Sequence, residues 1–568
     1  MTDIQTWLAR DPDPRTQQQL EQLLQENNQT ELNDRFRGRL EFGTAGLRGK
    51  VGAGPNRMNR LVIQETATGL GQYLLSQHDD ATSRGVVIGY DGRPDSQQFA
   101  QDTAGVLCAL GIKVYLTYQV AATPIVAFGI RHLNTVAGVV VTASHNPPEY
   151  NGFKVYWQNG AQIIAPHDQG IAAEIEKATT EPLNVMPLEQ AEQQGLLVWL
   201  EDDYYQTYRT AINQQPLLTP HANSAGQVII AYTAMHGVGA QMAEALLNDA
   251  GFTQVFSEAS QREPDGTFPT VNFPNPEEDG AMDRVIALAK VKGADIACAN
   301  DPDADRFAVA AKQADGQYTM LTGDQVGALL GDFVLSQSKD KTVLVGNTIV
   351  SSRLLSAIAQ QHNAEYYQTL TGFKWLTNVA MEKQSQEKPF AFAYEEALGY
   401  TIGSTVWDKD GLSALVAFSQ LTAQLKAQGL TVWDKLNSLY QEHGVYLNAQ
   451  RSIALDPNQP PIGDSLRANP PANIGGQNVS AVEDFKLGVR TTKEGQTSEI
   501  DLPSSDVLIY HLADQSRVVV RPSGTEPKLK CYYEVIQDVQ DGQDVQQAYE
   551  HAKQRMADLI ATHQSTIA

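Results

Sequence analysis

Three segments of this chain share one order of elements: an apolar strand, a polar turn, an amphipathic helix and a second strand. They span residues 86–116, 228–256 and 343–368. Each first strand is rich in β-branched residues, and each helix places apolar residues three and four positions apart, as in a βαβ crossover. The pattern predicts three related α/β domains. Identity between the segments is low, so the rival interpretation is that such units recur by chance in an α/β chain.

The length of the chain also requires several domains. The sequence has 568 residues, whereas a domain usually has roughly 100 to 200. We expect four domains, at 1–203, 204–320, 321–445 and 446–568. The last begins with a linker, because residues 456–476 are dense in proline and glycine. Alternating strands and a final helix with one apolar face follow the linker, which predicts a smaller α+β domain.

The net charge and the cysteine content indicate which kinds of molecule this protein binds and in which compartment it is found. The 42 basic and 66 acidic side chains give a net charge of −24, which argues against nucleic acid or an anionic membrane as the main partner. No apolar run approaches the ~20 residues that span a bilayer, and the N-terminus lacks the basic-then-apolar order of a signal peptide. Cys108, Cys298 and Cys531 lie singly in apolar stretches, as reduced core cysteines do. We therefore expect a cytoplasmic protein that acts on a small molecule.

A hydroxyl and an imidazole follow the apolar run 136–141. The sequence there is TASHNPP, which contains Ser144 and His145, and the end of a buried strand is where α/β enzymes keep their chemistry. A serine at this position is more often a helix cap or a turn residue than a nucleophile, and a lone histidine is often structural. If the site is functional, His145 would polarise a phosphoryl oxygen, and Lys154 would supply a cation or a base.

A second strand, 296–299, leads into the sequence DPDADR. Asp301, Asp303 and Asp305 put carboxylate oxygens on one side of an extended loop, which suits Mg²⁺ with positions left for phosphate. An EF-hand is excluded, because its sixth position, normally glycine, is Arg306. Three like charges repel one another without a cation, which favours a metal site over a solvated loop. A serine and a magnesium site together suggest phosphoryl transfer through a phosphorylated serine.

The sequence RPSGTEPK follows the strand 518–520 and is typical of a phosphate cradle. An arginine fork, hydroxyls and a glycine that admits close backbone approach would bind the phosphate, and the residues concerned are Arg521, Ser523, Gly524 and Thr525. A simple turn is the rival interpretation. A Walker motif is excluded, because Thr44 stands where its first glycine is required.

The sequence YEEALGY contains two adjacent acids, Glu395 and Glu396, which suit hydrogen bonds to neighbouring sugar hydroxyls. Lys409, between two aspartates, is a candidate for proton transfer. Surface charge is the rival interpretation for both. Two signals are weak on their own: the glycine-rich stretch 43–49 around Arg48, and Arg93 after the strand of the first segment.

Taken in order, TASHNPP, DPDADR, EEALGY and RPSGTEPK resemble the motifs of the α-D-phosphohexomutase superfamily, which includes the phosphoglucomutase/phosphomannomutase family. The resemblance extends from FGTAGLRG near the N-terminus to the last domain. It implies an α/β fold with three related domains with mixed sheets around a central cleft, and a smaller C-terminal α+β domain. It also implies that Ser144 is the phosphorylated serine and that one Mg²⁺ per chain is held by Ser144, Asp301, Asp303 and Asp305.

The resemblance assigns further roles. The residues that would surround the phosphoserine are Arg48, His145, Lys154 and Arg306. The residues that would contact the sugar are Thr371, Gly372, Glu395 and Glu396. The distal phosphate would be bound by Arg521, Ser523, Gly524 and Thr525. Either Lys154 or Lys409 would be the general acid/base.

One position departs from the family pattern. Ala397 stands where the sugar loop usually has serine, and EEALGY is closer to the branch of long phosphoglucomutases, phosphopentomutases and glucose-1,6-bisphosphate synthases. We expect a phosphoglucomutase that interconverts glucose 1-phosphate and glucose 6-phosphate through glucose 1,6-bisphosphate, as a monomer or homodimer. Phosphomannomutase, phosphopentomutase and bisphosphate synthase are the alternatives on the same scaffold. A Mg²⁺-dependent phosphohydrolase and a silent sugar-phosphate binding protein are the rivals of other classes.

Overall fold

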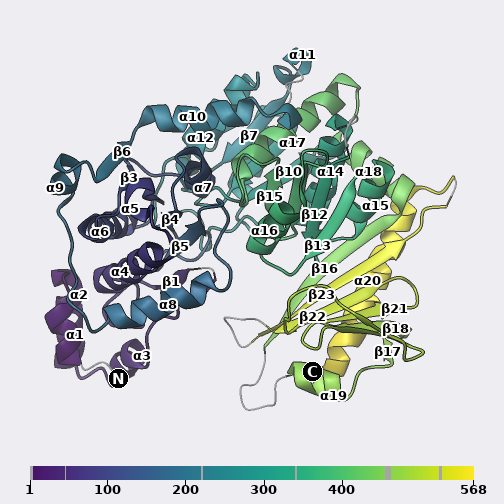
Figure 1. Ribbon diagram of the computed structural model, residues 1–568. Helices are drawn as coiled ribbons and strands as arrows, with labels where there is room; N and C mark the ends of the chain where they lie inside the picture. The colour runs from purple at the N-terminus through teal and green to yellow at the C-terminus, as the bar shows by residue number, and fades with distance from the viewer. Residues whose placement is uncertain are drawn as a thin grey trace. The chain divides into compact units, whose positions relative to one another are not determined.

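The computed structural model describes residues 4–44, 46–218, 222–338, 342–454, 462–522, 528–540 and 542–567. The chain forms two compact units (Figure 1). Unit 1 contains Met1–Leu321 and Leu398–Gln428, and unit 2 contains Thr322–Ala397 and Gly429–Ala568. Within the described part of the chain, every helix is too short or too polar to cross a membrane.

Unit 1 begins with three helices and a mixed six-stranded sheet. The strand order is β1-β5-β4-β2-β3-β6, in which β2, β3, β4 and β6 run parallel; β5 pairs antiparallel with β4, and β1 pairs antiparallel with β5 at the edge. The strands are β1 (Leu47–Lys50), β2 (Val86–Tyr90), β3 (Val114–Thr117), β4 (Ala137–Val141), β5 (Tyr150–Trp157) and β6 (Leu197–Leu200). The helices are α1 (Ile4–Arg10), α2 (Pro14–Gln25), α3 (Gln29–Phe36), α4 (Arg60–Gln77), α5 (Ala81–Arg84), α6 (Ser96–Ala109), α7 (Thr123–His132), α8 (His167–Ala178), α9 (Leu188–Gln193) and α10 (Asp202–Asn213).

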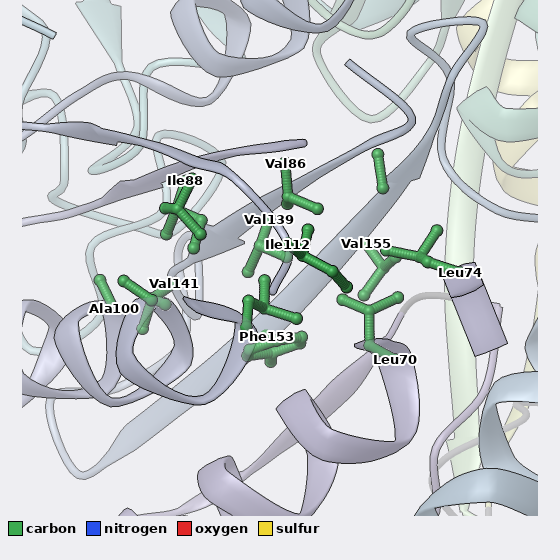
Figure 2. Close-up of a cluster of buried hydrophobic side chains, with 14 of the residues drawn as sticks. Leu70, Leu74, Val86, Ile88, Ala100, Ile112, Val139, Val141, Phe153 and Val155 are labelled. Carbon is green, nitrogen blue, oxygen red and sulfur yellow. The ribbon is translucent and has the colours of Figure 1, made fainter. Parts of the chain in front are cut away.

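The core of this first sheet explains why its strands form where they do. β2 and β4 are buried along their whole length, as expected for central parallel strands covered on both faces. Figure 2 shows Leu70 and Leu74 of α4 beside Val86, Val139 and Val155 of the sheet. The loop that starts at residue 142, after the carboxyl end of β4, therefore follows a strand that is fixed by burial along its whole length.

The second sheet of unit 1 has the order β11-β10-β9-β7-β8. Its strands are β7 (Ile229–Thr233), β8 (Gln254–Ser257), β9 (Ile296–Asn300), β10 (Phe307–Lys312) and β11 (Tyr318–Met320). The accompanying helices are η1 (Pro216–Leu218), α11 (Ala222–Ala225), α12 (Ala240–Asp249), η2 (Ala259–Gln261) and α13 (Asp283–Lys292). Residues 398–428 also belong to unit 1: they contain β15 (Gly399–Ile402) and α17 (Gly411–Ala427), and α17 packs against β9, β10 and α12.

Unit 2 contains three parallel strands of one sheet and, in a second sheet, antiparallel strands. The parallel strands are β13 (Glu365–Thr369), β12 (Leu344–Thr348) and β14 (Phe390–Glu395), in that order, with α14 (Gly323–Gln337), α15 (Leu354–Gln361), α16 (Phe373–Lys383) and α18 (Val432–His443). The antiparallel sheet has the order β16-β23-β22-β21-β18-β19-β20, and β17 pairs with β18. Its strands are β16 (Val445–Ala454), β17 (Asn473–Ile474), β18 (Gln477–Asp484), β19 (Val489–Thr492), β20 (Thr497–Glu499), β21 (Leu508–Leu512), β22 (Arg517–Pro522) and β23 (Lys528–Gln537). The helices of this part are α19 (Ile462–Ala468) and α20 (Val545–Ile567).

A buried ion cluster joins the two sheets of unit 2. Glu534 of β23 accepts hydrogen bonds from the side chain of Arg353 and from its backbone N–H, the latter at 2.8 Å. Arg517 Nε lies 3.2 Å from Glu534 Oε1, and its other nitrogens donate to the carbonyls of Ile349 and Ser351 at 2.9 and 2.5 Å. Although burial alone would raise the pKa of Glu534, the two guanidinium groups lower it to about 2. The carboxylate therefore stays charged and connects β22 and β23 to the loop after β12.

The predicted fold class is confirmed: three α/β domains with mixed sheets are followed by a smaller C-terminal domain. Residues 456–476, which were expected to form a linker, contain the helix α19 and the short strand β17. Residues 455–461 lie outside the described part of the chain. The helix α19 is held because Arg467 donates to Asp484 and Asp506 at 2.9 and 2.7 Å. The final helix buries the expected apolar face, and the three cysteines are free and buried.

Candidate active site

The serine loop follows β4. Ser144 adopts φ 51°, a left-handed conformation that is uncommon for a residue with a Cβ atom. Its backbone N–H donates to Thr142 Oγ1 at 2.8 Å, and its side chain donates from Oγ to Asp301 Oδ2 at 2.8 Å. Ser144 is 3 % exposed. Strained backbone of this kind concentrates at active sites, and here it directs a serine hydroxyl at a carboxylate.

Arg93 binds the backbone of the serine loop. Its guanidinium donates to four backbone carbonyls, at 2.6 Å for Ser144, 2.5 Å for Asn146, 2.8 Å for Pro147 and 3.0 Å for Tyr150. Arg93 Nε lies 3.3 Å from Asp91 Oδ2, and both side chains are buried. A planar group with five donors can fix several acceptors at once. The position of Ser144 therefore depends on Arg93.

The aspartate loop connects β9 to β10. Asp301, Asp303 and Asp305 are at most 1 % exposed, and one carboxylate oxygen from each lies within 4.8 Å of the others. The backbone N–H of Arg306 donates to Asp301 Oδ1 at 3.0 Å. The spacing expected from the sequence is thus realised: alternate side chains converge on one side of the loop.

These carboxylates fit a hard divalent cation. Asp303 Oδ1 and Asp305 Oδ1 are buried and accept no hydrogen bond from the described residues, an arrangement that is costly unless another group satisfies them. Burial and the neighbouring carboxylates also raise the pKa of Asp301 well above its usual value. A divalent cation would satisfy the unpaired oxygens and relieve the repulsion. The three aspartates could therefore hold Mg²⁺, with Ser144 Oγ next to Asp301 as a further candidate ligand.

Two lysines bring positive charge to the aspartates. Lys154 Nζ donates to Asp303 Oδ2 at 2.6 Å and to Asp305 Oδ2 at 2.9 Å. Burial favours the neutral amine, but these carboxylates outweigh it and raise the pKa of Lys154. Burial likewise favours neutral Asp303, yet the Lys154 ammonium holds the pKa of that carboxyl below its usual value. Lys409 Nζ lies 3.2 Å from Asp305 Oδ2, so both predicted lysines flank the aspartates.

Sequence reasoning missed three supporting residues. Thr123, the first residue of α7, donates from Oγ1 to Asp303 Oδ2 at 2.6 Å and from its backbone N–H to the Asp303 carbonyl at 2.9 Å. Asp408 lies 3.5 Å from Lys409 Nζ and accepts a hydrogen bond from the Tyr156 hydroxyl at 2.6 Å. The contacts of Thr123 with Asp303 and of Tyr156 with Asp408 join residues far apart in the chain, and no local sequence pattern marks them.

The remaining residues expected around the serine lie in the same unit. His145 Nδ1 is 3.2 Å from Ser144 Oγ; burial and then the charges of Arg306 and Arg48 lower the pKa of His145 well below its usual value, which keeps the imidazole neutral. Arg48 is on β1, is exposed, and donates to Asn146 Oδ1 at 2.9 Å. Arg306 is half-buried directly after Asp305.

Unit 2 groups the predicted sugar-contacting residues. Gly372 has φ 111°, and its backbone N–H donates to Glu395 Oε1 at 2.9 Å. Ser351 and Thr348 donate from their hydroxyls to Glu396 Oε2 at 2.8 and 3.3 Å. Burial, followed by the charge of Glu395, raises the pKa of Glu396 to about 8. At neutral pH the Glu396 carboxyl is therefore largely protonated and able to donate a hydrogen bond.

Arg521, near the end of β22, donates to the hydroxyl of Thr371. This contact brings one residue of the expected phosphate cradle next to the expected sugar turn. Ser523, Gly524 and Thr525, which we expected to complete the cradle, lie outside the described residues.

Comparison with known families covers most of the chain. Residues 39–182, 206–316 and 322–443 match the alpha/beta/alpha domains I, II and III described for phosphoglucomutase/phosphomannomutase, and residues 496–551 match the C-terminal domain of that family. A solved structure described as a putative phosphomannomutase from Thermus thermophilus has a TM-score of 0.67 and 20 % identity, covering 93 % of this chain and 99 % of that one. That likeness supports the fold.

Similar curated proteins carry names for three different sugars. A probable phosphomannomutase of Haemophilus influenzae is 40 % identical, covering 84 % of this chain and 92 % of its own. A phosphopentomutase of Mus musculus is 35 % identical, covering 98 % and 92 %. A phosphoglucomutase of Staphylococcus aureus is 35 % identical, covering 93 % and 95 %.

The four matched domains and these relatives agree with the motifs and with the arrangement of serine and aspartates. The chain belongs to the phosphoglucomutase/phosphomannomutase family.

Proposed function

We propose that this protein is a phosphoglucomutase, which interconverts α-D-glucose 1-phosphate and glucose 6-phosphate through phospho-Ser144 and glucose 1,6-bisphosphate. The observation that carries the proposal is the 2.8 Å contact between Ser144 Oγ and Asp301, inside a cluster of three buried carboxylates. A serine that carries a phosphoryl group beside a cation site is suited to phosphoryl transfer, which depends mainly on positioning and electrostatics.

The proposed reaction has two transfers. First, the 6-hydroxyl of glucose 1-phosphate attacks the phosphorus of phospho-Ser144; the new O–P bond forms, the Ser144 Oγ–P bond breaks, and the sugar hydroxyl gives its proton to the amine form of Lys409. Glucose 1,6-bisphosphate then reorients and returns its other phosphoryl group to Ser144, which leaves glucose 6-phosphate. Mg²⁺ bound by Asp301, Asp303 and Asp305 would stabilise negative charge on the transferring group.

The contacts of the two lysines suggest different roles. Lys154 is buried and donates to Asp303 and Asp305, so we assign it as a fixed cation that offsets charge. Lys409 lies 3.2 and 3.5 Å from the carboxylates of Asp305 and Asp408, and we assign it the proton transfer. Neutral His145, 3.2 Å from Ser144 Oγ, would hydrogen-bond a phosphoryl oxygen.

The sugar and the distal phosphate would be bound by residues of unit 2. Glu395 accepts from the backbone of Gly372, and protonated Glu396 has a proton to donate, so the pair offers both an acceptor and a donor to neighbouring hydroxyls. Thr371 and Gly372 would contact the sugar, and Arg521, Ser523, Gly524 and Thr525 would bind the phosphate that is not being transferred.

A pentose substrate is the second candidate, because the mouse phosphopentomutase aligns with 98 % of this chain and Ala397 replaces the serine usual in the hexose loop. Phosphomannomutase and glucose-1,6-bisphosphate synthase activities are alternatives on the same residues. A phosphohydrolase would use the same metal site to activate water.

The test is a substrate panel with the full chain, Mg²⁺ and catalytic glucose 1,6-bisphosphate. Glucose, mannose, ribose and deoxyribose 1-phosphates are compared by kcat/KM. We expect glucose 1-phosphate to be preferred, with no steady release of inorganic phosphate. A higher kcat/KM for ribose 1-phosphate would identify a phosphopentomutase, and stoichiometric phosphate release would identify a hydrolase.

The phosphoserine is tested separately by intact mass. The full chain incubated with glucose 1,6-bisphosphate should gain one phosphoryl group, and Ser144→Ala should not. A phosphorylated Ser144→Ala variant would contradict the assignment of Ser144.

A further inference from the structure

The serine loop and the aspartate loop are both supported by one segment that takes no part in the proposed chemistry. This segment, residues 261–270, follows β8 and belongs to unit 1. We call it the brace segment. Its two sides contact the supports of the two loops.

On one side, the brace segment packs against Arg93. The ring of Phe268 lies under the guanidinium, with 4.9 Å from Arg93 Cζ to the ring centroid, and Phe268 is buried. Gly266 lies so close to the backbone of Arg93 that a Cβ atom would be 2.5 Å from Arg93 Cα. Because Arg93 donates to the carbonyls of Ser144 and Asn146, the brace segment limits the movement of the serine loop.

On the other side, the brace segment holds the turn after β7. Met235 and His236 in that turn have positive φ values of 49° and 61°, a conformation that costs energy unless its surroundings enforce it. His236 Nε2 lies 2.7 Å from Thr270 Oγ1, and the Gln261 amide donates to the same hydroxyl at 2.8 Å. The backbone of His236 is bonded on both sides, to the Gln261 carbonyl and the Asp265 N–H, each at 2.9 Å.

The turn after β7 also contacts the aspartate loop. Val238 N–H donates to the carbonyl of Pro302 at 2.9 Å, between the first two aspartates. Gly237 faces Pro302 so closely that a Cβ atom would lie 2.3 Å from Pro302 Cα. The contacts therefore run without a break from Arg93 through the brace segment to Pro302.

We propose that the brace segment is a positioning element that sets the separation between the serine loop and the aspartate loop, through Phe268 on Arg93 and Thr270 on His236. The inference rests on the proposed function of that site. Phe268 and Thr270 act through other residues, and neither touches the reacting atoms. Outer partners of this kind commonly change metal affinity on the order of tenfold or more.

The experiment uses the full chain and four variants. Phe268→Leu removes the ring under Arg93. Thr270→Val removes the hydroxyl shared by His236 and Gln261, and Thr270→Ser restores it. Thr267→Ala is the control, because Thr267 is exposed on the same segment and its hydroxyl bonds only Asp265 among the described residues.

Two readouts do not depend on mutase turnover: Mg²⁺ affinity of the dephosphorylated chain by calorimetry, and amide hydrogen exchange at 142–150 and 300–306. We expect Thr270→Val to weaken Mg²⁺ binding on the order of tenfold, and Thr270→Ser to restore it. Phe268→Leu should speed exchange at 142–150 and lower kcat more than it raises KM. Thr267→Ala should match the parent.

Folded Thr270→Val and Phe268→Leu variants with parental Mg²⁺ affinity and parental exchange would overturn the proposal. Equal losses in Thr267→Ala would also overturn it, because the effect would then be general to the segment. If the chain turned over no sugar phosphate, the proposed function would fail while the Mg²⁺ and exchange readouts still decided the role of the brace segment.

Discussion

Two carboxylate clusters, one in each unit, follow the end of a strand and differ in what surrounds them. Asp301, Asp303 and Asp305 follow β9; Lys154 contacts Asp303 and Asp305, and Lys409 contacts Asp305. Glu395 and Glu396 end β14 and begin the loop after it, and in the described part of the chain Glu396 Oε2 accepts from the neutral hydroxyls of Ser351 and Thr348. In the first cluster Lys154 keeps the Asp303 carboxyl charged, and in the second the Glu396 carboxyl is neutralised by protonation.

The difference teaches how similar residues acquire different roles. A buried carboxyl keeps its charge only where opposite charge offsets desolvation. Lys154 does this for Asp303, whose pKa is lowered, whereas burial raises the pKa of Glu396 to about 8. Buried carboxylates with unpaired oxygens suit a metal ion, and a protonated carboxyl beside a second carboxyl suits sugar hydroxyls.

The largest expected effect comes from Asp303→Asn. It removes one proposed metal ligand and one of the two carboxylates that contact Lys154, so Mg²⁺ affinity should fall on the order of 100-fold, the upper end of the losses when partners of metal ligands are changed. Calorimetric titration and turnover at rising Mg²⁺ measure this. Asp249→Asn, in the surface pair with Arg209, is the matched control; equal losses in both variants would contradict a specific site.

Glu534→Gln tests whether charge pairing, and not membership of a unit, keeps a carboxylate ionised. Glu534 is in unit 2, as Glu396 is, yet Arg353 and Arg517 hold its pKa at about 2. Removing its charge leaves two guanidinium groups underpaired, and the free energy of unfolding should fall by about 3 kcal/mol. Denaturant unfolding followed by a unit 2 signal measures it. An unchanged midpoint would show that the pairing contributes nothing net.

Glu396→Gln should have a much smaller effect than Asp303→Asn. The Glu396 carboxyl is largely protonated at neutral pH because of its raised pKa, and an amide keeps both a donor and an acceptor. We expect kcat/KM at pH 7 to fall by less than about tenfold, a loss below about 1.4 kcal/mol. A loss as large as that of Asp303→Asn would mean that Glu396 acts as a charged group.

A further prediction concerns the pH dependence of stability. The folded pKa of Glu396 is about 8, above the usual value of 4.5, so between these values the folded chain binds more protons than the unfolded chain. The stabilisation is complete below pH 4.5 and is lost as pH rises towards 8. The unfolding midpoint of the parent should therefore fall relative to that of Glu396→Gln between about pH 5.5 and 8.5. Parallel profiles would contradict the raised pKa.

Local patterns predicted much of the site. Ser144 and Asp301 meet because each follows the carboxyl end of an apolar strand, and the alternation of the three aspartates was enough to predict their convergence. Arg93 could not be recognised in the same way, since its partners are backbone carbonyls, which leave no trace in side-chain identity. Thr123 contacts Asp303 across 180 positions, and only the packing of α7 reveals that contact.

The assignment of Lys409 also depended on packing. Its motif predicted a charged group, but the lysine reaches Asp305 because residues 398–428 pack with unit 1. At residues 456–476 the sequence pattern was misleading. Proline and glycine content indicated a linker, whereas the ion pairs of Arg467 stabilise the short helix α19 there.

The discontinuous course of unit 1 has a consequence for synthesis of the protein. Residues 322–397 of unit 2 lie in the chain between the aspartate loop and Lys409, so they leave the ribosome before unit 1 is complete. Nascent chains generally fold from the N-terminus, one domain at a time. When Asp301, Asp303 and Asp305 leave the ribosome, Lys154 has already been synthesised. Lys409 and α17, which complete unit 1, are synthesised only after residues 322–397. The proposed phosphoryl-transfer site therefore cannot be completed until most of the chain has been translated.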